Sequence, residues 1–256
     1  MWTRFKGTSV LHPLTECAQN YFRKGRSLMC SPPYVHRMSR RVGLAKATAK
    51  TLVTRPPRLL VIAGATGVGK STASVRLASR AGFTRIISTD AIREIMRVSD
   101  PEHNTPGLHR SSFSIGESGE AVIDWSETCL AVEEGIQATI DRARREGLDL
   151  LIEGVHINPS ARLLRSWEDA GGIAFGVVMS VDEERIHQDM LKSRDAQSYR
   201  RADRYLAGFS RIRQIQDGLI ERAKIARWPI VDPTRVDDDV ERIFTLFNRV
   251  IDEYHS

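Results

Sequence analysis

The residues best suited to chemistry in this sequence form one glycine-rich stretch, Gly64 to Thr72, which reads GATGVGKST. They satisfy the pattern G-x-x-x-x-G-K-[ST], and the apolar run Leu59 to Ala63 precedes them as a buried strand would. Glycines permit backbone conformations in which successive N–H groups turn inward and bind phosphate oxygens at the start of a helix. An ordinary glycine-rich turn would not need the Lys and Ser that follow, so the pattern predicts a phosphate-binding loop (P-loop).

The side chains of the P-loop predict how a nucleotide would be held. Lys70 would reach the β- and γ-phosphates of ATP, and the Ser71 hydroxyl would ligate Mg²⁺. The backbone of the whole loop would surround the phosphates. The residues assigned to nucleotide binding are Gly64, Ala65, Thr66, Gly67, Val68, Gly69, Lys70, Ser71 and Thr72.

Apolar strands alternate with amphipathic helices from Arg58 onward, which predicts an α/β fold with a parallel sheet covered by helices on both faces. The expected strands are Leu59–Ala63, Arg85–Ser88, Leu148–Glu153, Ile173–Ser180 and Trp228–Val231. The clearest helix is Ser126 to Arg145, with Asp124 as its start signal. Its apolar spacing includes Cys129, so we expect that thiol to pack in the core rather than to react.

Two acids stand where expected strands end. Because ligands of open α/β sheets bind beyond the carboxyl ends of the strands, we expect Asp90 and Glu153 near the P-loop. Asp90 could accept a proton from a hydroxyl or orient Mg²⁺, and it would equally suit a helix N-cap. Glu153 occupies a Walker-B-like place, where it could hold a Mg²⁺-bound water. His156, just beyond, could contact substrate or be satisfied by the backbone.

Basic and hydroxyl side chains after Asp90 could bind an anionic acceptor. Arg93 and Arg97 lie one helical turn apart, and guanidinium groups bind phosphate and carboxylate in two-pronged geometry. The polar loop Asn104 to Ser114 adds further candidates, although solvent exposure would explain these residues as well. The candidate substrate-binding residues of this region are Arg93, His109, Arg110 and Ser111.

An arginine cluster, RDAQSYRRADR at 194–204, interrupts the long helical region Asp182 to Ala226. In a phosphoryl-transfer enzyme, a lid at this place would close over ATP and supply positive charge to the transferring group. A solvated helix face is the alternative. Arg200 and Arg204 are the expected catalytic arginines of this lid.

The net charge of +6 belongs to one end of the chain. Residues 1–57 hold 11 Lys and Arg and one acid, which leaves 27 basic and 31 acidic residues in 58–256. We expect 1–57 to be a flexible basic extension, and 58–256 to be the enzyme domain. Binding to nucleic acid or an acidic surface, a transit peptide, and a true start at Met38 are the alternatives for the extension.

Composition narrows the class of protein further. No apolar run approaches the roughly eighteen residues that a membrane span needs. The three cysteines, Cys17, Cys30 and Cys129, are odd in number and far apart, so they fit neither a disulfide framework nor a metal site. We therefore expect a cytoplasmic protein.

Five blocks of the sequence, in order, resemble the 2-phosphoglycerate kinase family of P-loop kinases. The blocks are GATGVGKST, ISTDAIREIMR, LHRSSF, LLIEGVHINP and RYLAGFSRIRQIQDGLIERA. The resemblance implies transfer of the ATP γ-phosphoryl group to the free hydroxyl of 2-phosphoglycerate, which gives 2,3-bisphosphoglycerate. It also implies a core similar to shikimate and adenylate kinases, with five parallel strands in the order 2-3-1-4-5.

The resemblance also implies roles for single residues. Lys70 and Ser71 would contact nucleotide and Mg²⁺, and Asp90 would stand at the reacting centre. The implied acceptor contacts are Arg93, His109, Arg110, Ser111 and His156, and the implied metal ligands are Ser71, Asp90 and Glu153. Around Trp125 to Thr128 the family favours a Gly-Phe and a Gln that this sequence lacks.

Two other functions remain open at this level. One is a P-loop kinase for a different hydroxylated metabolite, such as a sugar phosphate, an antibiotic or a biosynthetic intermediate. The other is a nucleic-acid-associated NTPase that uses the basic extension, although the slightly acidic remainder of the chain argues against it. The sequence does not predict an oligomeric state.

Overall fold

The computed structural model describes residues 55–195, 202–235 and 239–256. These residues belong to one compact unit, Val53–Ser256. The prediction of a flexible basic extension falls on 1–57, nearly all of which lies outside the described residues. Arg200 and most of the expected lid lie outside them as well.

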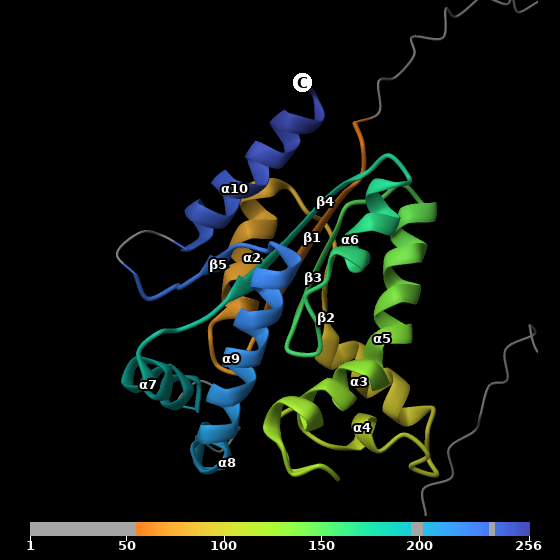
Figure 1. The fold of residues 1–256 in the computed structure, drawn as a ribbon. Helices are drawn as coiled ribbons and strands as arrows, with labels where there is room; N and C mark the ends of the chain where they lie inside the picture. Colours follow the sequence, from red (N-terminus) through yellow and green to blue (C-terminus); the bar gives the residue numbers. More distant parts are fainter. Residues whose placement is uncertain (1–54, 196–201, 236–238) are drawn as a thin grey trace, which may run out of the picture. The chain divides into compact units, whose positions relative to one another are not determined.

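A five-stranded parallel sheet forms the centre of this unit (Figure 1). Its strands are β1 (Arg58–Gly64), β2 (Ile86–Ser88), β3 (Leu150–Gly154), β4 (Ile173–Met179) and β5 (Ile230–Val231). They lie in the order β2-β3-β1-β4-β5, and every neighbouring pair is parallel. The fold class and strand order expected from the sequence are confirmed.

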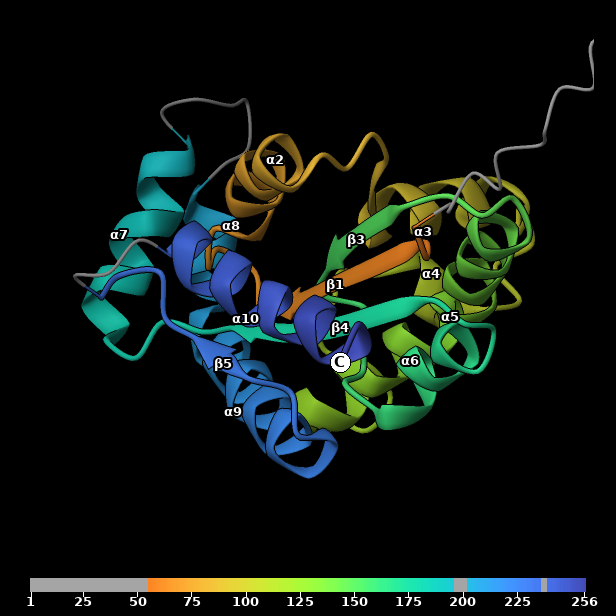
Figure 2. The same cartoon turned by 90° about the horizontal axis from the view of Figure 1, so that it is seen from above.

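Helices cover both faces of the sheet (Figure 2). The helices are α2 (Lys70–Ala81), α3 (Thr89–Val98), α4 (Pro106–His109), α5 (Ala121–Arg145), α6 (Ala161–Glu168), α7 (Glu184–Asp195), α8 (Ala202–Ala207), α9 (Phe209–Ala226) and α10 (Asp239–Tyr254). Figure 2 shows α2 and α10 on one face, and α6 and α9 on the other with α5 beside them. In the described part of the chain, no helix is both long and apolar enough to cross a membrane.

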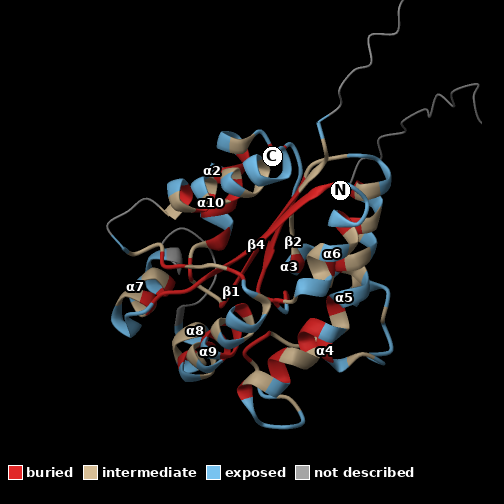
Figure 3. Ribbon diagram, turned by 45° about the horizontal axis from the view of Figure 1, so that its top comes forward, coloured by how far each residue is buried: buried red, intermediate tan, exposed pale blue. Residues whose placement is uncertain are grey.

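The central strands are buried because both of their faces are covered. Every residue of β4 is buried, and in β1 only Arg58 is partly exposed (Figure 3). A strand covered on both faces reads as a continuous apolar run, which is why β1 is recognisable in the sequence. Because β1 lies between β3 and β4, the P-loop that follows it starts at the middle of the sheet.

Two strands begin later than expected, for different reasons. The N–H of Leu148 bonds to the carbonyl of Ala143, which closes the end of α5 instead of starting β3. Before β5, the Trp228 indole packs so closely on Gly176 that a Cβ there would lie 2.3 Å from it. Pro229, the next residue, has no backbone N–H that could donate a hydrogen bond to a neighbouring strand. The remaining strand ends agree with the predictions to within one residue.

The long helix α5 also differs from its prediction. It begins at Ala121 rather than at Ser126, and Asp124 lies in its first turn with no exposed surface. Asp124 is therefore not the capping residue that the sequence predicted. Cys129 is buried, as expected, and burial raises the pKa of its thiol.

Candidate active site

The P-loop has the local structure that its pattern predicts. It connects the end of β1 to the first residue of α2, Lys70. Gly67 and Gly69 have φ angles of 91° and 85°, a region that residues with a Cβ rarely adopt. A Cβ on Gly64 would lie 2.5 Å from the Met179 carbonyl oxygen, so β4 approaches the loop too closely for any side chain.

The Lys70 side chain folds back over the loop. It is buried, and its Nζ donates a hydrogen bond of 2.8 Å to the carbonyl oxygen of Ala65. The ammonium group is therefore held against the P-loop, where a cation would face bound phosphate oxygens.

Ser71 and Glu153 meet at the carboxyl end of the sheet. The Ser71 Oγ donates a hydrogen bond of 2.9 Å to Glu153 Oε1, and Glu153 is buried. Glu153 pairs in register with Ile62 of β1 and Ser88 of β2, so it stands between the P-loop strand and the strand that leads to Asp90. The two predicted metal ligands on these elements are thus neighbours.

Asp90 is the second residue of α3, and its carboxylate is open to solvent. Its side chain is 60% exposed, in contrast to the buried Glu153. The hydroxyl of Ser88 accepts a hydrogen bond of 3.1 Å from the Ala91 N–H and caps the helix. The alternative that Asp90 caps α3 is therefore wrong.

His156 lies beneath Asp90, almost fully buried. Its Nδ1 is 3.2 Å from Thr89 Oγ1 and 3.7 Å from Asp90 Oδ1. Burial lowers the pKa of His156 to about 4, although the charge of Asp90 acts in the opposite direction. Because its Nδ1 contacts a side-chain hydroxyl, the expectation of a histidine satisfied by backbone is wrong. A neutral imidazole, bonded to Thr89, therefore lies next to Asp90 at neutral pH.

The predicted acceptor residues lie around the loop after α3, and each of their side chains has at least one protein partner. Arg93 donates to the carbonyl of Arg110 at 2.9 Å and to that of Leu108 at 3.4 Å, so it holds the loop. His109 Nε2 lies 3.3 Å from Asp100 Oδ2, and its ring stacks on His103 with centroids 3.7 Å apart.

Arg110 is paired mainly with one exposed acid. It forms an ion pair with Glu127, whose side chain is 42% exposed, and donates to the Asp124 carbonyl at 2.8 Å. Ser111 accepts a hydrogen bond from Arg204 of α8, and the Arg204 guanidinium lies over Phe113. Arg204, at the end of the expected lid, thus contacts the candidate acceptor loop.

A buried ion pair that the sequence analysis missed organises this same loop. Arg211 of α9 donates to Asp124 Oδ2 at 2.6 Å and to the carbonyls of Phe113 and Gly119 at 3.0 and 2.7 Å. Burial by itself would raise the pKa of Asp124, but hydrogen bonds from Gly116, Ser118 and Arg211 outweigh it and hold the pKa well below its usual range. In the sequence, the position of Asp124 on the apolar face of a helix is the one sign of this buried ion pair.

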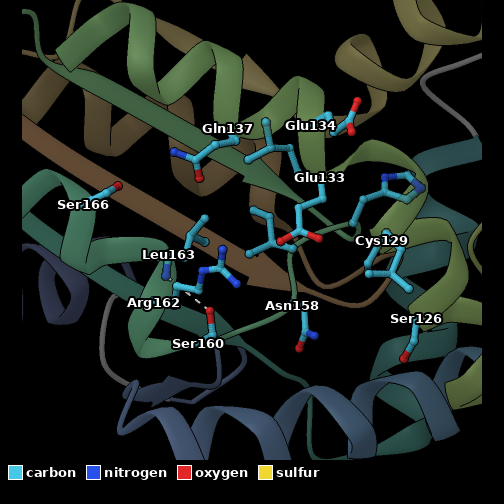
Figure 4. Close-up of a pocket in the computed structure, with 14 residues that line it drawn as sticks. Ser126, Cys129, Glu133, Glu134, Gln137, Asn158, Ser160, Arg162, Leu163 and Ser166 are labelled. Atoms are coloured by element: carbon cyan, nitrogen blue, oxygen red, sulfur yellow. Dashed lines mark hydrogen bonds between the residues drawn. The ribbon is translucent and has the colours of Figure 1, made fainter. Parts of the chain in front are cut away.

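A cavity of about 590 Å³ opens between α5 and α6 (Figure 4). Figure 4 shows Glu133 of α5 and Arg162 of α6 directed toward one another across it. His156 also borders this cavity, so the same residue contributes to the cavity wall and lies next to Asp90.

Among the described residues, no group of three or more His, Cys, Asp or Glu could hold a metal ion. Mg²⁺ does not require such a group, because it is usually held by one or two protein oxygens together with waters and substrate phosphates. The oxygens of Ser71 and Glu153, with the open carboxylate of Asp90 in the first turn of α3, fit a site of this kind.

Comparisons with known proteins reveal several relatives. A 2-phosphoglycerate kinase from Thermococcus kodakarensis is 35% identical over 212 residues, which cover 80% of this chain and 71% of the relative. The 2-phosphoglycerate kinase of Methanopyrus kandleri is 34% identical, over 75% of this chain and 61% of the relative. The 2-phosphoglycerate kinase of Methanocaldococcus jannaschii is 30% identical, over 77% of this chain and 65% of the relative. The chain thus spans less than two thirds of the length of the Methanopyrus kandleri and Methanocaldococcus jannaschii relatives.

Comparisons with family models and with solved structures do not identify a family for this chain. No protein-family model matches the chain. Among solved structures, a gluconokinase from Sinorhizobium meliloti matches with a TM-score of 0.47 at 14% identity, covering 78% of this chain and 97% of that one. The fold assignment rests instead on the strand order. From the extent of the match to the Thermococcus kodakarensis relative, the chain belongs to the 2-phosphoglycerate kinase family.

Proposed function

We propose that this protein transfers the γ-phosphoryl group of ATP to the free hydroxyl of 2-phosphoglycerate, giving ADP and 2,3-bisphosphoglycerate. The observation that carries the proposal is the open carboxylate of Asp90, which follows β2 two residues after Ser88, the register partner of Glu153. Glu153 in turn accepts a hydrogen bond from Ser71. A hydroxyl bound at Asp90 would face phosphates bound at the P-loop, because β2 and β1, which lead to them, flank β3 and end at the same edge of the parallel sheet.

In this mechanism the protein positions the reactants and balances charge. The P-loop N–H groups and Lys70 would hold the phosphates. The acceptor oxygen would form a bond to the γ-phosphorus while the bond to the bridging oxygen of ADP breaks. Asp90 would take the hydroxyl proton or hold it until it reaches solvent, while His156 holds the neighbouring Thr89 at the start of α3.

Mg²⁺, when bound, would neutralise charge on the β- and γ-phosphates. Ser71 and Glu153 would hold it, with Asp90 contributing through water. The hydrogen bond between Ser71 and Glu153 keeps these oxygens together, so the protein part of such a site is prepared in advance.

The acceptor's phosphate and carboxylate would bind the loop that carries Arg93, His109, Arg110 and Ser111. Arg110 is the best placed of these, because its ion-pair partner is a single exposed carboxylate that an anionic substrate could replace at little cost. Arg93 holds two backbone carbonyls, so it would act partly by shaping the loop.

A second acceptor remains a candidate because of one observation. Trp125, where the sequence departs from the family pattern, is fully buried and donates from its Nε1 to the Val155 carbonyl at 2.7 Å. That bond ties α5 to the residue before His156. A change of family pattern at this point could therefore alter which hydroxylated anion fits.

Product analysis tests the proposal. The protein would be incubated with ATP, Mg²⁺ and, separately, 2-phosphoglycerate, 3-phosphoglycerate, glycerate and a panel of sugar phosphates. We expect mass spectrometry to find 2,3-bisphosphoglycerate in amounts equal to the ADP released. Transfer only to another acceptor would replace the substrate assignment, and ADP release without any phosphorylated acceptor would contradict the kinase mechanism.

A further inference from the structure

Helix α7 contacts the P-loop through a histidine that the sequence analysis did not single out. His187 is fully buried, and its Nε2 lies 2.9 Å from the carbonyl oxygen of Thr66. The edge of its ring meets Phe209 of α9, with centroids 5.4 Å apart and an angle of 71° between the planes. The side chain is thus fixed between α9 and the P-loop backbone.

The contact defines where the proton on this ring lies. A carbonyl oxygen can only accept a hydrogen bond, so His187 Nε2 must carry the hydrogen. Its Nδ1 is buried and has no hydrogen-bond partner among the described residues. Burial lowers the pKa of His187 and outweighs the hydrogen bond to Thr66, which would raise it; the charges of Arg213 and Lys70 lower it further. The ring is therefore the neutral Nε2–H tautomer at neutral pH.

Because the peptide bond is planar, the contact with the Thr66 carbonyl also sets the direction of the next N–H group in the P-loop. The carbonyl of Thr66 and the N–H of Gly67 belong to one planar trans peptide, and they point in opposite directions. A carbonyl held toward His187 consequently turns the Gly67 N–H away from α7. The inner side of a P-loop is the side to which its N–H groups must point in order to bind phosphate.

A second contact from α7 reaches the same peptide. A Cβ on Gly67 would lie 2.4 Å from Leu191 Cδ2 and 3.3 Å from His187 Nε2. One turn of α7 therefore packs directly against the loop and leaves no room for a side chain there. The polar contact and the packing contact together fix both the place and the orientation of the Thr66–Gly67 peptide.

We propose that His187 is a positioning residue for nucleotide binding, which holds the Thr66 carbonyl so that the Gly67 N–H is directed at a phosphate oxygen. The inference rests on the proposed binding of ATP at the P-loop. It adds a role for α7, which supplies none of the expected nucleotide contacts itself.

His187→Leu is the main test, because it keeps an apolar side chain in place and removes the donor. The Thr66 carbonyl would lose its partner and the peptide its orientation, so we expect the Kd for MgADP and MgATP to rise by about tenfold. The KM for the acceptor should stay the same. His187→Gln offers an N–H at a similar distance, and we expect it to restore the Kd to within about threefold of the original.

Phe209→Leu is the matched control for packing. It loosens the ring that contacts His187 without removing the hydrogen bond, so it should lower the Tm and leave the nucleotide Kd unchanged. Calorimetric titration of all four proteins would measure the Kd. Unchanged affinity in His187→Leu would overturn the inference, and so would equal losses in His187→Leu, His187→Gln and Phe209→Leu.

A spectroscopic measurement separates this inference from the proposed function. In protein labelled with ¹⁵N-histidine, the His187 signals are assigned by their loss in His187→Gln. We expect a neutral ring protonated at Nε2. A ring protonated at Nδ1 would contradict the hydrogen bond even if nucleotide binds. Failure of the unaltered protein to bind nucleotide would instead overturn the proposed function.

Discussion

The P-loop side and the acceptor side of the candidate site are built in different ways. On the P-loop side, the backbone turn is set mainly by glycines of one short stretch and by the local contact from Lys70 to Ala65. His187 and Glu153 each add one long-range hydrogen bond. On the acceptor side, the loop after α3 is held by charged side chains from distant helices, above all by Arg211 of α9 bonded to Asp124 of α5. The first arrangement follows from local sequence, whereas the second depends on the completed fold.

This difference has a consequence for function. A loop whose turn is set mainly by its own glycines can present the same phosphate contacts to a nucleotide common to many kinases. A loop held by exchangeable ion pairs, such as Arg110 with Glu127, can be adapted to different acceptors. Substitutions on the two sides should therefore have separable effects.

Lys70→Ala should have the largest effect, and it should act on the P-loop side alone. We expect kcat to fall by about a thousandfold, since a buried cation facing the transferred phosphates is removed. Steady-state ADP release measures this. Lys192→Ala, which removes an exposed lysine from α7, should keep full activity. Activity within tenfold of the original in Lys70→Ala would remove that residue from the mechanism.

Asp124→Asn should damage the acceptor side instead. Arg211 would lose its buried partner, and we expect the free energy of unfolding to fall by about 3 kcal/mol. The acceptor KM should rise while the nucleotide Kd is unchanged, because the P-loop does not depend on this pair. Urea unfolding and the two binding constants measure the outcome.

Asp141→Asn provides the control for Asp124→Asn on the same helix. It removes a partly exposed pair with Arg144, so it should cost less than about 0.5 kcal/mol. A rise in nucleotide Kd in Asp124→Asn as large as that in acceptor KM would refute the separation of the two sides.

His156 lies between the two sides, and its burial predicts a smaller, pH-dependent effect. The unfolded chain binds a proton on this ring below about pH 6.5, whereas the folded chain binds it only below about pH 4. Stability should therefore fall as the pH is lowered through this window, by about 2 kcal/mol between pH 6.5 and 5. Urea unfolding at several pH values would measure the slope, and His156→Gln should flatten it. An equal slope in both proteins would exclude His156 as its source.

The sequence predicts the P-loop side of this site better than the acceptor side. The strand, glycine turn and helix of the P-loop follow from residues that are adjacent in the chain, and so does the position of Asp90 after β2. The start of α5 was predicted wrongly because Asp is a frequent capping residue. The actual hydrogen-bond partners of Asp124 lie on the preceding loop and on α9.

Long-range contacts explain the other differences as well. Nothing near His187 in the sequence indicates that it bonds to Thr66, more than a hundred residues away. The expected substrate contacts of Arg93 and His109 remain predictions, and both side chains already bond to other parts of the protein. Local patterns predict where a backbone turns, but not which distant side chain will bind it.

The central claim is that Asp90 guides the acceptor hydroxyl toward a phosphate bound at the P-loop. Asp90→Asn tests it most directly, because the amide keeps the size of the side chain but cannot take a proton. We expect the Kd for MgATP to stay within about twofold, and the transfer of phosphate to 2-phosphoglycerate to fall by at least about a hundredfold. Transfer at the original rate in Asp90→Asn would contradict the account.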